Sequence, residues 1–400
     1  MGDFESSGAH PLSRILAIKL AYDAGIVTFV RDDLMVATAP LSRPQGVGAT
    51  VASSTLFPQQ SRMEFVASDH TLSVKLSTGQ DRCELPTVYL DQRDWIDFAR
   101  WAKDPQTVTP AKREFFELLA SSANEERVVI PLSGAHLKET SKRGGASRVQ
   151  LAATMLRYSR GWQMRSVLAL RRAELRALFG GAPLTISDVV TLAPRAVFDM
   201  ERPEPAAPDL DPEISDLIER QVWATVLTDL LIDPDPMPDE GKEVVEKWSQ
   251  SFLPLATAIP GNGKAKARIR DLTRTRFISD LGTDLPGAAK EAGLSSEEFG
   301  TWLSDRSEED LALTPGLGRM REVLHLRIAN ATEKWEANDL NDFLHLSYAA
   351  AYCDLVLGEK KTINYLRRVN PKVPAGAKLH YRAEDALIDL KRLLEVVLPD

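Results

Sequence analysis

Three short apolar segments, each beside a helical pattern, constrain the fold of this chain most. Residues 86–91 (PTVYLD), 127–132 (RVVIPL) and 353–357 (CDLVL) have the length and β-branched content of buried strands. Helix-period apolar patterns follow each of them. Strands that alternate with helices predict an α/β fold with a parallel sheet covered by helices on both faces, a three-layer arrangement.

The rest of the chain divides around these segments. Residues 1–85 alternate short apolar pieces with Ser-, Gly- and Pro-rich stretches, which leaves open a small β-rich domain or a poorly ordered segment. Residues 86–180 form the first part of the α/β domain, and 318–400 form its second part with a C-terminal helix. Between them, 181–317 reads as a mostly helical insertion without a convincing strand.

Several boundaries inside these parts follow from local signals. Linkers are expected at 201–212 and 232–239, where Pro and Asp are frequent. A long helix is expected over about 318–336, and another from Asp342 to about 351. The insertion should hold helices at 213–231, 240–252, 264–280, 286–293 and 296–303.

Composition limits the classes of protein that this chain can represent. Hydrophobic residues make up 44% and charged residues 26% of 400 residues, which is a globular balance long enough for two or three units. No apolar run reaches the ~18–20 residues of a membrane span, and no signal peptide is recognisable. Two cysteines provide neither a disulfide framework nor zinc-ligand spacing. We therefore expect a cytoplasmic protein with no membrane partner.

Acidic residues lie at the ends of the expected strands and at the starts of helices. Asp91 closes the first strand, Glu139 lies on the helix after the second, and Asp342 begins a later helix. Asp354 and Glu359 flank the last strand. Ligands bind beyond the carboxyl ends of parallel strands, so these acids can converge from distant parts of the chain. Carboxylate oxygens suit Mg²⁺ or Mn²⁺, although acids at helix starts also occur as caps.

The order and wording of these segments resemble the PIN-domain nuclease superfamily. Residues 88–91 (VYLD) are similar to the family's first strand with its leading Asp, and 132–139 (LSGAHLKE) to the segment that carries its Glu. Residues 342–349 (DFLHLSYA) and 351–360 (AYCDLVLGEK) are similar to the third Asp with its helix and to the following strand. The resemblance covers about 86–180 and 318–370.

The resemblance implies a PIN-like fold and a site made of particular residues. Asp91, Glu139 and Asp342 are the expected catalytic metal ligands, with Mg²⁺ or Mn²⁺ as the cofactor. The family's last strand commonly ends in Thr-x-Asp, whereas this chain has Leu357-Gly358-Glu359. Either Glu359 or Asp354 then supplies the fourth ligand.

Other residues near these segments have two readings each. Asp339 is a helix cap or supports a ligand from behind, with the cap favoured. His345 and His136 face the site or serve in packing and hydrogen bonding, with the latter favoured. Ser133 positions Glu139 or only caps its helix.

The function that follows is metal-dependent endonucleolytic cleavage, with RNA favoured over DNA. The products that the resemblance implies carry 5′-phosphate and 3′-hydroxyl ends. Ten Lys and Arg against two Glu occur between 138 and 176, and a basic run of this kind can hold a phosphate backbone. The expected backbone contacts are Lys138, Lys142, Arg143 and Arg148.

Two alternatives stay open. The Gly-Glu departure and the net charge of −8 favour a PIN-like module that has lost cleavage and binds nucleic acid or protein. A DNA-cleaving defence nuclease is the other alternative, because a carboxylate site does not itself read the 2′-hydroxyl. The helical insertion is the expected surface for a protein partner, and a homodimer is also compatible with the sequence.

Overall fold

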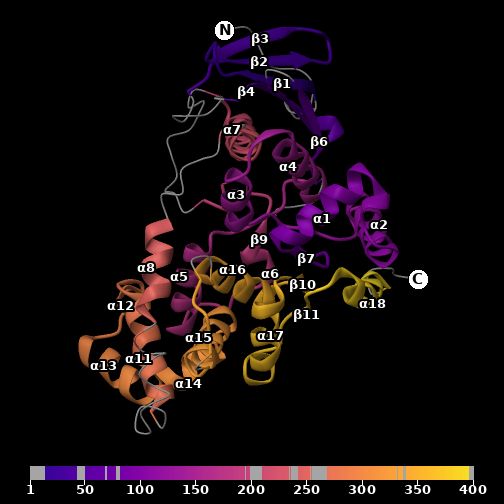
Figure 1. Cartoon of the computed structure of the whole chain (residues 1–400). Helices are drawn as coiled ribbons and strands as arrows, with labels where there is room; N and C mark the ends of the chain where they lie inside the picture. Colours follow the sequence, from indigo (N-terminus) through magenta and orange to yellow (C-terminus); the bar gives the residue numbers. More distant parts are fainter. Residues whose placement is uncertain are drawn as a thin grey trace.

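The protein has a mixed α/β architecture in the computed structural model (Figure 1). The described residues are 14–42, 50–67, 70–77, 82–193, 195–198, 210–233, 235, 242–252, 254, 268–330, 332–336 and 339–395, with only the backbone of 242, 244 and 245. They form a six-stranded antiparallel sheet, a three-stranded parallel sheet and a two-stranded sheet. None of the described helices combines the length and the apolar character that crossing a bilayer requires.

The first part of the chain folds into the antiparallel sheet. Its strands are β1 (Ile15–Ala21), β2 (Ile26–Arg31), β3 (Val36–Pro40), β4 (Val51–Phe57), β5 (Arg62–Ala67) and β6 (Thr71–Lys75), in the order β3-β2-β1-β4-β5-β6. Alternation drives their formation, since Met63, Phe65 and Ala67 of β5 are buried while the residues between them are more exposed. Of the two alternatives for residues 1–85, the β-rich one is therefore correct for the described residues, and 1–13 lie outside them.

The parallel sheet lies at the centre of the second part. It consists of β7 (Val88–Leu90), β10 (Leu355–Leu357) and β11 (Lys378–His380), in the order β11-β10-β7. The strand expected at 127–132 is present only as two parallel bridges, from Thr87 to Val129 and from Leu132 to Gln163. Pro131 between them has no N–H to donate, which interrupts the ladder.

Helices cover both faces of this sheet. Val88 and Leu90 of β7 pack into one hydrophobic cluster, and Tyr89 between them packs into the other. The first cluster includes side chains of α1 (Gln92–Lys103), α2 (Pro110–Asn124), α4 (Gly145–Ser159) and α18 (Ala383–Glu395). The second includes α5 (Val167–Leu178), α15 (Pro315–Ile328), α16 (Asp339–Tyr352) and α17 (Lys360–Val369). Alternation within the strands thus produces three layers.

Residues 181–317 are mostly helical, as expected, but they do not form one unit. The helix α7 (Pro212–Ile232) packs against the antiparallel sheet, with Tyr22 Oη 2.6 Å from Thr225 Oγ1. The remaining helices pack against α5, α15 and α16 at the other end of the molecule (Figure 1). They are α8 (Lys242–Ser251), α11 (Ile269–Leu281), α12 (Asp284–Glu291), α13 (Ser296–Asp305) and α14 (Ser307–Leu313).

Several smaller expectations need correction. A two-residue strand, β9 (Val190–Thr191), occurs where no strand was expected, and it pairs with β8 (Gln163–Met164). The helix expected to reach 336 ends at Ile328, because the Asn330 side chain accepts hydrogen bonds from Thr332 and turns the chain. The two expected linkers lie largely outside the described residues.

Short elements complete the described chain. They are α3 (Gly134–Ser141), α6 (Ile186–Val189), and the 3₁₀ turns at Pro58–Gln60, Pro105–Thr107 and Asn370–Lys372.

Candidate functional site

The candidate site lies at the carboxyl ends of β7 and β10. From β7 the chain builds the sheet in one direction through Val129 and Gln163, and later in the other direction through β10 and β11. The strand order therefore reverses between β7 and β10. Ligands of open parallel sheets bind at this kind of position, outside the carboxyl ends of the strands.

Asp91 and Glu359 are adjacent at this point of reversal. The backbone N–H of Asp91 donates to Leu357 O at 2.9 Å, and the backbone N–H of Glu359 donates to the Asp91 carboxylate. Asp91 is also the N-cap of α1, where its Oδ1 accepts from the Gln92 N–H at 2.8 Å. Burial nevertheless raises the pKa of Asp91 above its usual value.

Glu139 reaches the site from α3, which is tied to the end of β7. The His136 ring donates from Nε2 to Leu90 O at 2.7 Å and accepts at Nδ1 from the Ser133 N–H at 3.0 Å. Gln92 Nε2 donates to Thr140 Oγ1 at 3.0 Å. These bonds bring α3 close to the start of α1, so Glu139 lies near Asp91.

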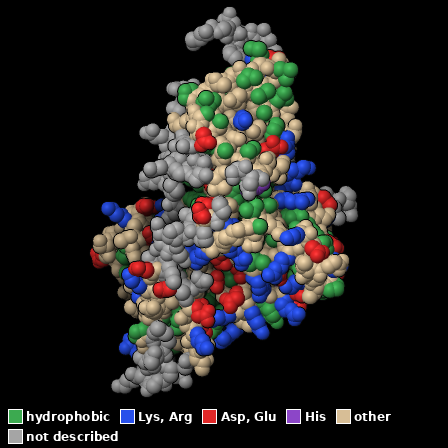
Figure 2. Space-filling model, turned by 45° about the horizontal axis from the view of Figure 1, so that its top comes forward, with side chains coloured by type: hydrophobic (Ala, Val, Ile, Leu, Met, Phe, Trp, Pro, Cys, Tyr) green, Lys and Arg blue, Asp and Glu red, His purple; other side chains and the backbone are tan. Residues whose placement is uncertain are grey.

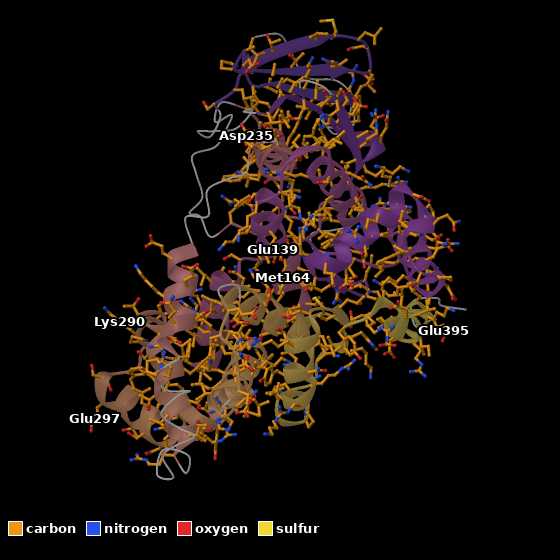
Figure 3. All side chains as sticks on the ribbon, in the orientation of Figure 1. Glu139, Met164, Asp235, Lys290, Glu297 and Glu395 are labelled. Carbon is orange, nitrogen blue, oxygen red and sulfur yellow. The ribbon has the colours of Figure 1, made fainter. Side chains whose placement is uncertain are left out.

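The charge balance around Glu139 confirms this proximity. Burial and the charge of Asp91 raise the pKa of Glu139 to about 7, whereas Lys142, Arg143 and Lys138 act to lower it. Near pH 7 this carboxyl is therefore divided between its neutral and charged forms. Figure 3 labels Glu139 near the centre of the molecule.

Asp342 on α16 interacts with the largest number of other acids. Burial and the charges of Asp91, Glu139, Glu359 and Asp339 raise its pKa to about 8. The helix approaches the strand end closely because residue 358 is glycine, where a Cβ would lie 2.9 Å from Leu346 of α16. Four carboxylates from four separate segments thus share one electrostatic environment.

Asp354, the other candidate for the fourth ligand, lies elsewhere. Its Oδ2 accepts from the Thr87 N–H at 2.8 Å and from Thr87 Oγ1 at 2.9 Å. Thr87 precedes β7 and Asp354 precedes β10, so this contact is at the amino ends of the strands, opposite to Asp91. The structure brings Glu359 and not Asp354 to the group, and the expectation for Asp354 is corrected.

Asp339 belongs to an ion-pair network behind the site. It is buried, and its carboxylate lies 2.6 Å from Arg327 Nη2 and 3.2 Å from Lys361 Nζ. Glu333 contacts the same two cations. Asp339 thereby fixes the start of α16, three residues before Asp342, through ion pairing rather than through a cap visible in the described residues.

Ser133 and His345 lie close to the site without completing it. Ser133 Oγ is 2.9 Å from Tyr89 Oη and is fully buried, so its role is to hold α3 against β7. Burial lowers the pKa of His345 to about 4, and nearby Lys138 lowers it further. Its Nδ1 has no hydrogen-bond partner among the described residues.

One residue at the site was missed by the sequence reasoning. Asp94 is 1% exposed, and burial together with the charges of Asp91 and Asp97 raises its pKa to about 7, against the lowering effect of Arg93. Asp94 follows Asp91 by three residues on α1, which places the two on one helix face. That spacing was the available signal.

The expected basic contacts divide into two kinds. Arg148 is completely buried and donates to the carbonyls of Leu231, Leu230, Ser141, Arg143 and Asp235. It is therefore a structural residue, and the expectation that it contacts nucleic acid is wrong. The charges of Lys138, Lys142 and Arg143, in contrast, act on Glu139.

Acidic and basic side chains are also mixed on the molecular surface. On the face drawn in Figure 2, acidic side chains gather near the middle, and Lys and Arg side chains lie beside them. A surface of this kind keeps the net charge negative while offering cations to an anionic ligand.

The donor chemistry of the acidic group suits a hard divalent cation. Asp91, Glu139, Asp342 and Glu359 offer only carboxylate oxygens, which Mg²⁺ and Mn²⁺ prefer. Among the described residues, no three His, Cys, Asp or Glu side chains are already placed to hold a metal ion. The four carboxylates would have to turn inward around a cation.

Comparison of the chain with protein-family models, with curated protein sequences and with solved structures found no match.

Proposed function

We propose that this protein is a metal-dependent endonuclease that cleaves RNA. The observation that carries the proposal is the gathering of Asp91, Glu139, Asp342 and Glu359 at the reversal of strand order. Like charges are unfavourable together in a partly buried place. Their convergence from positions up to 268 residues apart is accounted for by a cation that they hold in common.

In this proposal the four carboxylates hold Mg²⁺ or Mn²⁺. A bound ion of this kind supplies an activated water and stabilises the leaving oxygen of a phosphodiester. Lys138, Lys142 and Arg143 attract the phosphate backbone toward the acids. Arg327 and Lys361 neutralise Asp339 and keep α16 in place. The resemblance of 88–91, 132–139 and 342–360 to PIN-domain nucleases supports the same reaction.

The test compares cleavage of a mixed RNA by the wild-type protein and by Asp91→Asn and Asp342→Asn. Wild type should cleave with Mn²⁺ and stop in EDTA, and each variant should lose at least about 100-fold in rate because a ligand is neutralised. Asp354→Asn is the matched control, since Asp354 adjoins the same strands at their opposite ends. Activity that survives in both site variants contradicts the proposal.

The second candidate is a PIN-like module that binds nucleic acid or protein without cleavage. It is favoured by Glu359 in place of the family's Asp and by the open arrangement of the carboxylates. Calorimetric titration separates the two candidates. RNA binding without Mn²⁺ binding supports the module, whereas Mn²⁺ binding that Asp342→Asn abolishes supports the nuclease. Single-stranded DNA in a parallel assay tests the DNA-cleaving alternative.

A further inference from the structure

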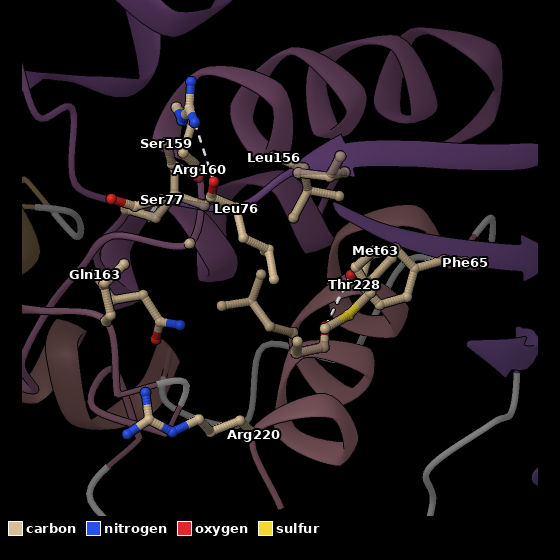
Figure 4. Close-up of a pocket in the computed structure, with 16 residues that line it drawn as sticks. Met63, Phe65, Leu76, Ser77, Leu156, Ser159, Arg160, Gln163, Arg220 and Thr228 are labelled. Carbon is tan, nitrogen blue, oxygen red and sulfur yellow. Dashed lines mark hydrogen bonds between the residues drawn. The ribbon is translucent and has the colours of Figure 1, made fainter. Parts of the chain in front are cut away.

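A mostly apolar cavity of about 140 Å³ lies between the antiparallel sheet and the α/β part of the molecule (Figure 4). It is separate from the acidic site. The strands β5 and β6 form one wall, and α4 and α7 form others. Its apolar lining residues are Met63, Phe65, Val74, Leu76, Leu132, Leu156, Leu192, Ala224 and Leu227.

The size and lining of this cavity select a class of occupant. An apolar cavity of about 150 Å³ is large enough to bind benzene and stays dry without a ligand. Unfilled apolar space destabilises a core, because the lining atoms lose their dispersion contacts. The apolar part of the cavity therefore suits a compact ring or a short branched chain.

One buried polar group breaks the apolar character. Gln163 is 3% exposed, and its Oε1 accepts no hydrogen bond from any residue that the structure describes. Figure 4 shows its side-chain amide extending from β8 toward the cavity. A buried acceptor without a donor costs roughly 1–3 kcal/mol, so this atom is expected to receive a donor from outside the chain.

The other polar groups of the lining that can be followed are already engaged within the protein. Arg160 donates to Asn124 O at 2.9 Å and to Glu126 at 2.6 Å. Thr228 Oγ1 donates to Ala224 O at 2.8 Å. Arg220 Nε donates to Asp216 at 2.8 Å, in a pair that is about half exposed. Gln163 thus offers the hydrogen-bonding atom that a ligand in this cavity would meet.

We propose that this cavity is a binding site for a small ligand with an apolar body and one hydroxyl or N–H donor. The body lies among Phe65, Leu132 and Leu227, and the donor binds Gln163 Oε1. The proposal does not depend on nuclease activity, because no acidic residue of the candidate site lines the cavity.

The test uses probe pairs that differ only in the donor. Indole is compared with 1-methylindole, and phenol with anisole, by calorimetry and by the rise in melting temperature of the full chain. For at least one pair we expect the donor-bearing probe to bind about tenfold more tightly than its methylated partner, the effect of one buried hydrogen bond.

Two variants assign the effect to the cavity. Gln163→Met keeps the length of the side chain and removes the acceptor, so it should bind both members of a pair equally. Ala224→Phe fills the cavity and should bind none of the probes, with circular dichroism showing that it remains folded. The proposal is overturned by equal binding of both members to wild type, by unchanged binding to Ala224→Phe, or by no binding at all, which would leave water as the partner of Gln163.

Discussion

Asp342 shows most clearly how the candidate site affects the stability of the protein. Its pKa is raised to about 8 from an unfolded value near 3.8, with burial as the largest cause and neighbouring acids next. Between these two pH values the folded protein binds more protons than the unfolded chain. Stability that is present at low pH is therefore lost as pH rises through the folded pKa.

The first prediction concerns this loss. Without divalent metal, wild type should be less stable at pH 8 than at pH 5.5, and Asp342→Asn should be the more stable protein at pH 8 by at least about 1 kcal/mol. Removing a repelling charge is the reason. Melting curves at both pH values in EDTA measure the difference. Asp23→Asn is the control, because Asp23 is exposed in a turn of the antiparallel sheet.

Two results would oppose this account of Asp342. If Asp342→Asn is less stable than wild type at pH 8, the carboxylate makes favourable contacts that outweigh the repulsion. If Mn²⁺ stabilises both proteins equally, Asp342 does not take part in holding the ion.

At the residue scale, sequence position alone identified the acids that follow strands. Asp91 and Glu359 come directly after apolar runs, and parallel strands bring such positions together. Position did not separate Glu359 from Asp354, because the choice depends on which strand end faces the site. Asp94 was missed since its environment comes from burial, which spacing does not reveal.

Arg148 shows how an element is held together by a residue that looks like a surface cation. It donates to carbonyls at the end of α7, Leu230 and Leu231, and to Ser141 and Arg143 after α3. The last carbonyls of a helix have no partner within it. One guanidinium therefore joins the ends of two helices, and burial lowers its pKa against the nearby charges of Asp233 and Asp235.

The second prediction follows from this arrangement. Arg148→Lys should lower the free energy of unfolding by roughly 2–4 kcal/mol, because an ammonium cannot reach all of these carbonyls and some stay unpaired. Urea unfolding measures this loss. The affinity of the folded protein for RNA should not change.

Arg143→Gln is the matched variant for this experiment. Its guanidinium acts on Glu139 and lies in the basic group of the candidate site, so we expect weaker RNA binding and a smaller dependence on salt, with stability unchanged. The opposite pattern, with RNA affinity lost in Arg148→Lys and kept in Arg143→Gln, would restore the sequence interpretation of Arg148.

Helices were easier to predict than strands in this chain. The expected helix at 213–231 corresponds to α7, and that at 296–303 to α13, because amphipathic periodicity over several turns is a strong signal. The strands of the parallel sheet contain only three residues each. Lys378–His380 was not expected to be a strand, since so short a run carries no period.

At the scale of the whole molecule, the antiparallel sheet and the α/β part share one core. Ile18 of the sheet, Leu227 of α7, Leu156 of α4 and Leu90 of β7 belong to the same cluster of buried side chains. Buried hydrogen bonds add to this joint, such as the one from Gln221 Nε2 to Ile18 O at 3.1 Å. The sequence predicted the separate parts but not this union, because contacts between distant segments leave no local pattern.

The third prediction is that the two parts unfold together. All seven tryptophans lie after residue 90, so tryptophan fluorescence reports the α/β and helical parts and not the antiparallel sheet. Phe65 of β5 is 3% exposed, and Phe65→Ala should cost about 3–5 kcal/mol. If the core is continuous, this change lowers the midpoint of the fluorescence transition in urea. The neighbouring Val66→Ala, at a position that is 38% exposed, should leave the midpoint nearly unchanged. A fluorescence midpoint that does not move in Phe65→Ala, while far-ultraviolet circular dichroism shows an earlier loss of strand signal, would show that the sheet unfolds independently of the rest.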